Sequence, residues 1–144
     1  MKVYNAPLYY EIAFGFISAK KQVDLFEKFI TKYSRIKVKC ILDIGCGPSL
    51  QLREIATRGY RAIGLDESAA MLRYLKQRAR DENVHIETVR ADMTNFRLIK
   101  KVDFVCIMMG TIQLIENYKK FLQHLDSVAY ALKRGDCILL KISG

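Results

Sequence analysis

Residues 41–52, "ILDIGCGPSLQL", join a short apolar run to a helical pattern through a turn that contains two glycines. Gly45 and Gly47 let the backbone turn sharply and let a ligand approach without a Cβ in the way. Ser49 is suited to cap the helix that follows, and Pro48 fixes its entry. The free N–H groups at the start of that helix suit a polar ligand. The stretch therefore predicts a strand, a ligand-binding turn and a helix.

The rest of the chain alternates between helical and strand periodicity. Val23, Phe26 and Ile30 recur at helical spacing, whereas the apolar run 103–109 is typical of a central parallel strand covered on both faces. Helices are predicted over 19–33, 50–57, 67–80 and about 121–132, the last closed by a turn at 133–135, and strands over 38–44, 60–65, 84–90, 103–109 and 137–142. This order predicts an α/β fold in one domain, 1–144. Its sheet is doubly wound and mostly parallel, with about five strands and helices on both faces.

The cysteines and the apolar run near the N-terminus bear on where the protein is found. The four cysteines fall in or beside apolar runs and form no CxxC pair, which indicates reduced, mostly buried thiols. The run 12–19 follows an acidic residue and precedes two lysines, the reverse of a secretory charge order, and it is too short to span a bilayer. We expect a cytoplasmic protein that does not enter the membrane.

Three aspartates lie at the ends of three successive predicted strands. Asp43 stands two positions before Gly45, Asp66 ends the second strand, and Asp92 follows the third. Because the carboxyl ends of parallel strands meet at one edge of the sheet, the three carboxylates indicate a single site. Asp66 can accept both hydroxyls of a ribose, and Asp92 can accept a hydrogen bond from an amine such as that of adenine.

Each aspartate also has a plainer interpretation. Asp43 or Asp92 could cap a neighbouring turn, and Asp66 could cap the helix predicted to begin at residue 67. Methionines such as Met93 are, taken singly, more often core residues than cofactor contacts.

The kind of ligand follows from what the turn lacks. Leu50 stands where the dinucleotide fingerprint GxGxxG needs its third glycine, and the carboxylate of Asp43 is badly placed for a pyrophosphate. An acidic crevice instead suits an amino group or a sulfonium. This favours S-adenosylmethionine over a dinucleotide.

The sequence resembles the class I S-adenosylmethionine-dependent methyltransferases over nearly its whole length. Five segments carry the resemblance, in order: "ILDIGCGPS", "AIGLDESAAML", "VRADM", "VDFVCIMMGTIQLI" and "ALKRGDCILL". The resemblance implies S-adenosyl-L-methionine as cofactor. It implies that Asp43, Gly45, Cys46 and Gly47 line the methionine part, Asp66 the ribose, Asp92 and Met93 the adenine, and Met108 and Met109 the edge near the methyl group. We also expect Glu67, next to Asp66, to be a cofactor-binding residue. Cys46 is more plausible as a small packing residue than as a nucleophile.

No residue stands out as a catalytic base. His85 and His124 are distant in sequence from the crevice segments, so we expect them to be structural or solvated. Aromatic residues near the N-terminus, Tyr10 among them, could fold over the cleft, where an aromatic face attracts a sulfonium. They could equally pack the first helix.

The chain departs from the family pattern in three places. Ser49 replaces the third glycine of the first segment, and Asp136 replaces a glycine before the last strand. Family members usually continue through two more strands, whereas this chain ends just after the fifth. An unpaired apolar edge invites pairing with another chain. Either the sequence is a fragment, or a homo-oligomer or partner chain covers the edge formed by 137–142.

The methyl acceptor is left open between two classes. The formal net charge of +9 would suit RNA, but the basic residues are scattered, and the N-P-P-[YF] signature of many nucleic-acid amino methyltransferases is replaced by "MMGTIQ". The main hypothesis is therefore a methyltransferase acting on a small molecule. The alternatives are a catalytically silent cofactor-binding module that acts as a partner subunit, and, less favoured, an RNA methyltransferase.

Overall fold

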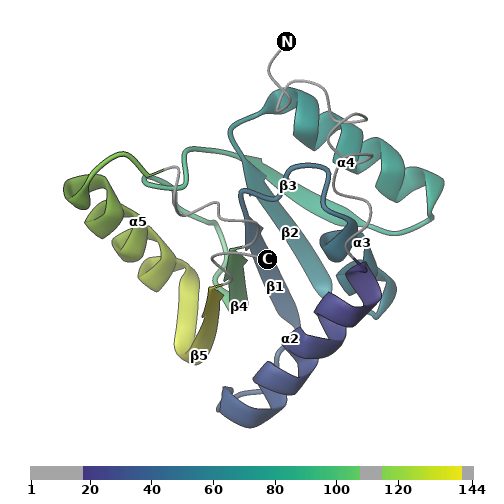
Figure 1. The fold of residues 1–144 in the computed structure, drawn as a ribbon, viewed down its shortest axis with the longest axis horizontal. Coiled ribbons are helices and arrows are strands. Elements are labelled where there is room, and N and C mark those ends of the chain that lie inside the picture. The colour runs from purple at the N-terminus through teal and green to yellow at the C-terminus, as the bar shows by residue number, and fades with distance from the viewer. Residues whose placement is uncertain (1–17, 108–114, 141–144) are drawn as a thin grey trace.

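The computed structural model describes residues 18–107 and 115–140, with the backbone alone at 134–140. The helices are α2 (Ala19–Tyr33), α3 (Leu50–Thr57), α4 (Ala69–Asp81) and α5 (Tyr118–Ala131). The strands are β1 (Cys40–Ile44), β2 (Arg61–Asp66), β3 (Ile86–Arg90), β4 (Val102–Ile107) and β5 (Leu132–Leu140). Figure 1 shows the strands side by side, with helices flanking them.

The described strands form one parallel sheet in the order β3-β2-β1-β4-β5. In the register, Ile44 lies beside both Leu65 and Ile107, so β1, β2 and β4 end at the same level. The first strand, β1, lies in the middle of the sheet. From β1 the chain continues through β2 to β3 at one edge, and then returns to the other side of β1 to form β4 and β5. The strand order therefore reverses at β1, where an open α/β sheet binds ligands beyond its carboxyl ends. The predicted α/β fold is confirmed.

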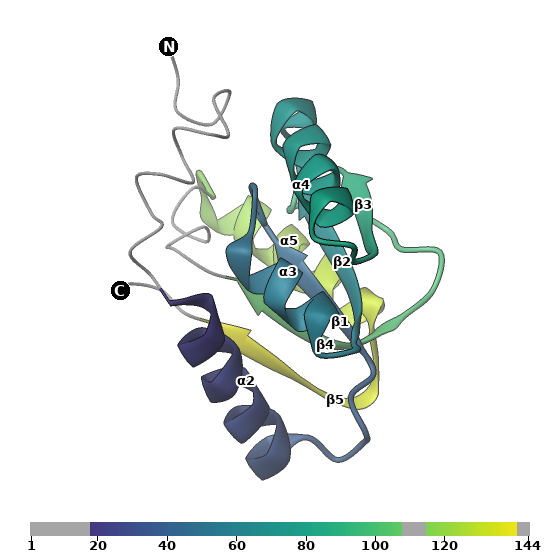
Figure 2. The same cartoon turned by 90° about the vertical axis from the view of Figure 1, so that its right-hand side faces the viewer.

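Helices cover both faces of this sheet, as predicted. One apolar cluster packs residues of α2, α3 and α4, such as Phe26, Leu52 and Leu75, against the strands. The other cluster packs Val128 of α5 and Phe96 of the β3–β4 connection against the opposite face. Figure 2 shows the same separation from a second direction. Burial of these two apolar faces is the main force that holds the layers together.

Several boundaries differ from the predictions by two or three residues, among them the starts of β1 at Cys40, of β3 at Ile86 and of α5 at Tyr118. Two further differences have a cause that the structure shows. Helix α4 begins at Ala69, after residue 67, because Ser68 caps it and accepts a hydrogen bond from the Met71 N–H (3.2 Å). The predicted turn at 133–135 is wrong, because β5 already begins at Leu132. The pairing of β4 with β5 shifts register between Val102 and Phe104, and the additional residues of β5 are absorbed there.

Asp103 explains why the chain can pair at the start of β5. Its side chain is buried in β4, where it accepts hydrogen bonds from the Lys39 N–H (2.8 Å) and the Cys40 N–H (3.0 Å) and forms an ion pair with Lys133 (2.8 Å). Burial opposes ionisation, but these three donors hold the pKa of Asp103 below its ordinary value. The carboxylate thus anchors the beginnings of β1 and β5 to β4.

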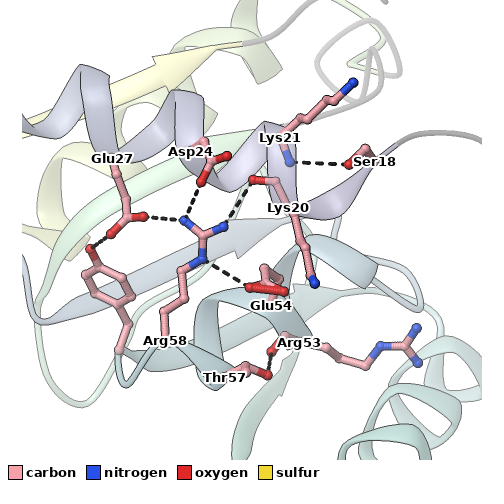
Figure 3. Close-up of polar contacts among 10 residues, drawn as sticks. Ser18, Lys20, Lys21, Asp24, Glu27, Arg53, Glu54, Thr57 and Arg58 are labelled. Carbon is pink, nitrogen blue, oxygen red and sulfur yellow. Dashed lines mark hydrogen bonds and ion pairs between the residues drawn. The ribbon is translucent and has the colours of Figure 1, made fainter.

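Arg58, just after α3, attaches helix α2 to the rest of the domain (Figure 3). Its guanidinium forms ion pairs with Asp24 (2.9 Å) and Glu27 of α2 and with Glu54 of α3 (3.1 Å), and it donates to the Lys20 carbonyl (3.1 Å). A single side chain therefore satisfies groups on two helices.

Replacing Arg58 with methionine is expected to lower the free energy of unfolding by about 2 kcal/mol, because a network with charged acceptors loses its common donor. Urea titration measures this value. Arg61→Met is the matched control, since its main interaction is an exposed ion pair with Glu87 (2.5 Å), and its loss should cost less than about 1 kcal/mol. Equal losses in the two variants would contradict the proposed importance of the network.

Candidate functional site

The glycine turn after β1 is fastened to the end of β2. The N–H groups of Gly45 and Cys46 both donate to the carbonyl of Leu65, at 2.8 and 3.1 Å. Gly45 and Gly47 have φ values of 66° and 54°, in the left-handed region that glycine adopts without strain. The tight turn that the sequence predicts is confirmed, and its path depends on both glycines.

Ser49, at the position of the missing third glycine, also has a positive φ of 25°. This conformation is unfavourable for a residue with a side chain. Its hydroxyl compensates by donating to Asp43 Oδ2 (2.8 Å) and accepting from the Leu52 N–H (2.9 Å). The predicted helix cap is confirmed, and the same hydroxyl ties the helix to Asp43.

Asp43 is the buried acid of the site. It is 2% exposed, and among the described residues no N–H or O–H group donates a hydrogen bond to its Oδ1. Burial raises its pKa to about 7, although hydrogen bonds from the Ser49 hydroxyl and the Cys106 thiol partly oppose this, and the negative charge of Asp66 adds to it. A buried acceptor without a donor is costly. Its unused oxygen therefore fits a donor supplied by a ligand, such as an ammonium group.

Asp66 joins the glycine turn to the start of α4. Its Oδ2 accepts from the Gly47 N–H (2.9 Å), and its Oδ1 accepts from the Ser68 N–H (2.8 Å). The carboxylate is only partly buried, and each oxygen has a second lone pair for a ligand hydroxyl. The helix cap is Ser68, so Asp66 supports the turn before the cap. Glu67 follows at the same strand end and is exposed.

Asp92 and Met93 open the connection after β3. The Ala91 N–H donates to the Asp66 carbonyl (3.2 Å), so this connection begins beside Asp66. Asp92 Oδ1 accepts from the backbone N–H (2.8 Å) and the hydroxyl (2.7 Å) of Thr94, and these bonds lower the pKa of Asp92. Asp92 thus does hold a local turn, the plainer of its two interpretations. The exposed carboxylate can still contact a ligand.

Several predicted site residues have other outcomes. Cys46 is buried, packs in the core beneath the turn, and burial raises the pKa of its thiol, in keeping with a packing role. Tyr10, Met108 and Met109 lie outside the described residues. His85 is exposed just before β3. His124 is buried and contacts the Met93 carbonyl through Nδ1 (2.8 Å), a link to the site that its distance in sequence conceals.

Gly64, in β2, also supports the site, although our sequence analysis missed it. A Cβ built at Gly64 would lie 2.8 Å from Cys46 Sγ, 3.0 Å from Leu52 and 3.1 Å from Leu75. The absence of a side chain lets the turn and α3 pack closely on the sheet. A glycine inside a predicted strand is the signal that could have revealed this contact.

Comparison with known proteins gives a consistent result. The family model of the methyltransferase domain matches residues 41–135. A protein of Geobacillus sp. (strain WCH70), provisionally named as a methyltransferase, is 28% identical over 121 residues, which cover 81% of this chain and 49% of that protein.

Among the described residues, no helix has the length and apolar character needed to cross a membrane.

Two solved structures share the fold. An S-adenosylmethionine-dependent methyltransferase from Clostridium acetobutylicum ATCC 824 aligns with a TM-score of 0.82 and 17% identity, over 94% of this chain and 55% of the other. An amino pentose methyltransferase from Micromonospora echinaspora, solved with S-adenosylmethionine bound, aligns with a TM-score of 0.74 and 23% identity, over 97% and 56%. The chain thus spans about half the length of these proteins. Since the family model covers well over half of the chain, the protein belongs to the methyltransferase domain family, and its resemblance to class I S-adenosylmethionine-dependent methyltransferases is confirmed.

Proposed function

We propose that this domain binds S-adenosyl-L-methionine and takes part in transfer of its methyl group to a small-molecule acceptor. The observation that carries the proposal is the hydrogen bond between the Gly47 N–H and Asp66 Oδ2 (2.9 Å). It brings the bare backbone of the turn and a partly exposed carboxylate together at the carboxyl edge of the sheet, where the strand order reverses.

The residues present fit the separate parts of this cofactor. Asp43 has an unpartnered buried oxygen for the ammonium of the methionine part, beside Gly45, Cys46 and Gly47. When bound, the cofactor supplies an electrophilic methyl group on a sulfonium. The protein's task is then to bind, orient and exclude water. The remaining assignments are Asp66 and Glu67 to the ribose, Asp92 and Met93 to the adenine, and Tyr10, Met108 and Met109 to the region near the methyl group.

Two observations favour a small-molecule acceptor. The structurally similar protein from Micromonospora acts on an amino pentose. The basic residues of this chain are scattered along the sequence, whereas a nucleic-acid surface would gather them. An RNA acceptor remains the weaker alternative, and RNA binding that falls steeply with salt would favour it. Location in the cytoplasm stays a prediction.

Calorimetry with S-adenosylmethionine and S-adenosylhomocysteine tests the cofactor directly. Binding of both is the expected result, and failure to bind either contradicts the proposal. Transfer of labelled methyl groups to pools of small molecules or RNA then identifies the acceptor class.

Replacing Asp66 with alanine is expected to weaken S-adenosylhomocysteine binding by about 1 to 3 kcal/mol, because the ribose hydroxyls and the Gly47 N–H lose their acceptor. Calorimetric titration measures the change. Asp81→Ala, at the far end of α4, is the control and should leave the affinity unchanged. An unaltered affinity in Asp66→Ala would rule out the ribose assignment.

A silent partner subunit is the second candidate, and the outer edge of β5 favours it. Within the described sheet, β5 is a terminal strand. On neighbouring α5, Tyr118, Leu122 and Leu125 recur along one flank and are exposed. A second copy of the chain could pair with this edge about a two-fold axis, since a strand edge is self-complementary.

Light scattering across a concentration series tests this candidate. A dimer that Leu122→Glu dissociates, together with cofactor binding but no methyl transfer, would support it. A monomer at all concentrations would exclude self-pairing through β5.

A further inference from the structure

Helix α5 holds the connection after β3 at two points. The Nδ1 atom of His124 lies 2.8 Å from the carbonyl oxygen of Met93, and the N–H of Phe96 donates to the hydroxyl of Ser127 (3.3 Å). His124 and Ser127 are three positions apart, so both project from the same side of the helix. Both are buried, and His124 is only 1% exposed.

The direction of the His124 bond follows from its partner. A carbonyl oxygen can only accept a hydrogen bond, so Nδ1 carries the hydrogen and the imidazole is the donor. A buried polar ring with a short bond to backbone is well suited to fix that backbone, because loss of the donor would leave the carbonyl unsatisfied.

Residues 92–96, which include the contacts with His124 and Ser127, form one hydrogen-bonded turn. Thr94 donates to Asp92 Oδ1 through both its N–H and its hydroxyl, and the Asn95 N–H donates to the Asp92 carbonyl (3.0 Å). Phe96 is buried in the core beneath α5. The orientation of the Asp92 carboxylate is therefore coupled to the placement of the Met93 carbonyl next to it.

We propose that His124, supported by Ser127, is a positioning residue that sets the selectivity of the site for adenine. It does so by holding the turn at residues 92–96 so that the Asp92 carboxylate faces the exocyclic amine. This inference rests on the proposed function, in which Asp92 accepts a hydrogen bond from the adenine. In this role His124 acts through the Met93 carbonyl and not by direct contact with the cofactor.

The test compares two ligands that differ only at the base. S-adenosylhomocysteine carries the amine, whereas S-inosylhomocysteine carries an oxygen in its place and repels the carboxylate. The wild-type protein should bind the first about tenfold or more tightly than the second, which is the range for one hydrogen bond to a charged group. The ratio of the two dissociation constants is the readout, because a general loss of stability lowers both affinities alike.

The His124→Phe variant retains a ring but loses the hydrogen-bond donor, so the ratio of the two dissociation constants should fall to a value between about 1 and about 3. His124→Asn places an amide N–H near the position of Nδ1 and should keep most of the wild-type ratio. Ser127→Ala removes the second anchor and should lower the ratio by about threefold. Val128→Ala, a buried change in the same helix that removes no hydrogen bond, is the control for stability and should leave the ratio unchanged.

The outcomes distinguish a failure of cofactor binding from a failure of the role proposed for His124. If the wild-type protein binds neither ligand, the proposed function fails and the inference with it. If the wild-type protein binds both equally, the assignment of Asp92 to the adenine fails together with the inference, while cofactor binding itself stands. If the wild-type protein discriminates but His124→Phe and Ser127→Ala keep the full ratio, the inference alone is overturned. If His124→Phe does not fold, an unchanged ratio in Ser127→Ala is sufficient to overturn it. A change in Val128→Ala as large as that in His124→Phe would also overturn it.

Discussion

Replacing Asp43 with asparagine is expected to abolish a pH dependence of the free energy of unfolding. In the wild-type protein this free energy should fall by about 4 kcal/mol as the pH rises from about 4 to about 7. The pKa of Asp43 is raised from 3.8 to about 7 in the folded protein, mainly by burial. A shift of about three pH units corresponds to about 4 kcal/mol.

The sign of this effect is unusual for a carboxyl group. Because the folded state binds the proton more tightly than the unfolded state, the contribution of Asp43 is fully present below pH 4. It is lost as the pH rises through about 7. Urea titrations at several pH values measure the difference between the two proteins. Asp92→Asn is the control, since hydrogen bonds from Thr94 lower the pKa of Asp92 and its contribution is constant in this window.

The same titration should appear in cofactor binding. If the ammonium group of S-adenosylhomocysteine binds the ionised form of Asp43, the protein must release a proton on binding below pH 7. The affinity should then rise about tenfold per pH unit up to pH 7 and level off above it. Asp43→Asn should bind weakly and without this slope. A wild-type affinity that is constant between pH 5 and pH 8 would exclude the contact.

Replacing Gly64 with valine is expected to lower the free energy of unfolding by about 3 kcal/mol or more. The added atoms would overlap Cys46 Sγ and the ends of Leu52 and Leu75. All three side chains are buried, so they cannot move aside into solvent. Gly64→Ala should cost less, about 1 to 3 kcal/mol. Both variants should also weaken cofactor binding, because displacement of Cys46 shifts the glycine turn.

A double substitution tests whether Cys46 transmits this effect. Cys46→Ala removes the atom nearest to the new Cβ, so it should restore part of the stability and affinity that Gly64→Ala loses. Gly59→Ala is the control: nothing lies within 4 Å of its Cβ, and its φ of 94° adds backbone strain away from the site. If the double variant is no better than Gly64→Ala alone, the clash is with the leucines.

The sequence was most informative where local chemistry and fold agree. The apolar run before Gly45 predicted β1, Ser49 predicted the cap of α3, and the order of strands and helices predicted the parallel sheet. Its boundary errors included the starts of α4 and β5. The start of α4 is set by the local cap at Ser68, whereas the start of β5 depends on a contact with a distant residue. The Lys133 side chain bonds to Asp103 in another strand, and nothing near Lys133 in sequence signals that partner.

The sequence by itself therefore determined which residues turn, cap and pack, because glycine conformation, hydroxyl capping and apolar periodicity act within a few residues. Only the tertiary structure decided that Asp43 is a weak acid with an unused oxygen, that Gly64 lies under Cys46, and that His124 reaches Met93. Burial, close approach and a hydrogen bond between distant segments exist only once the sheet and its helices are assembled.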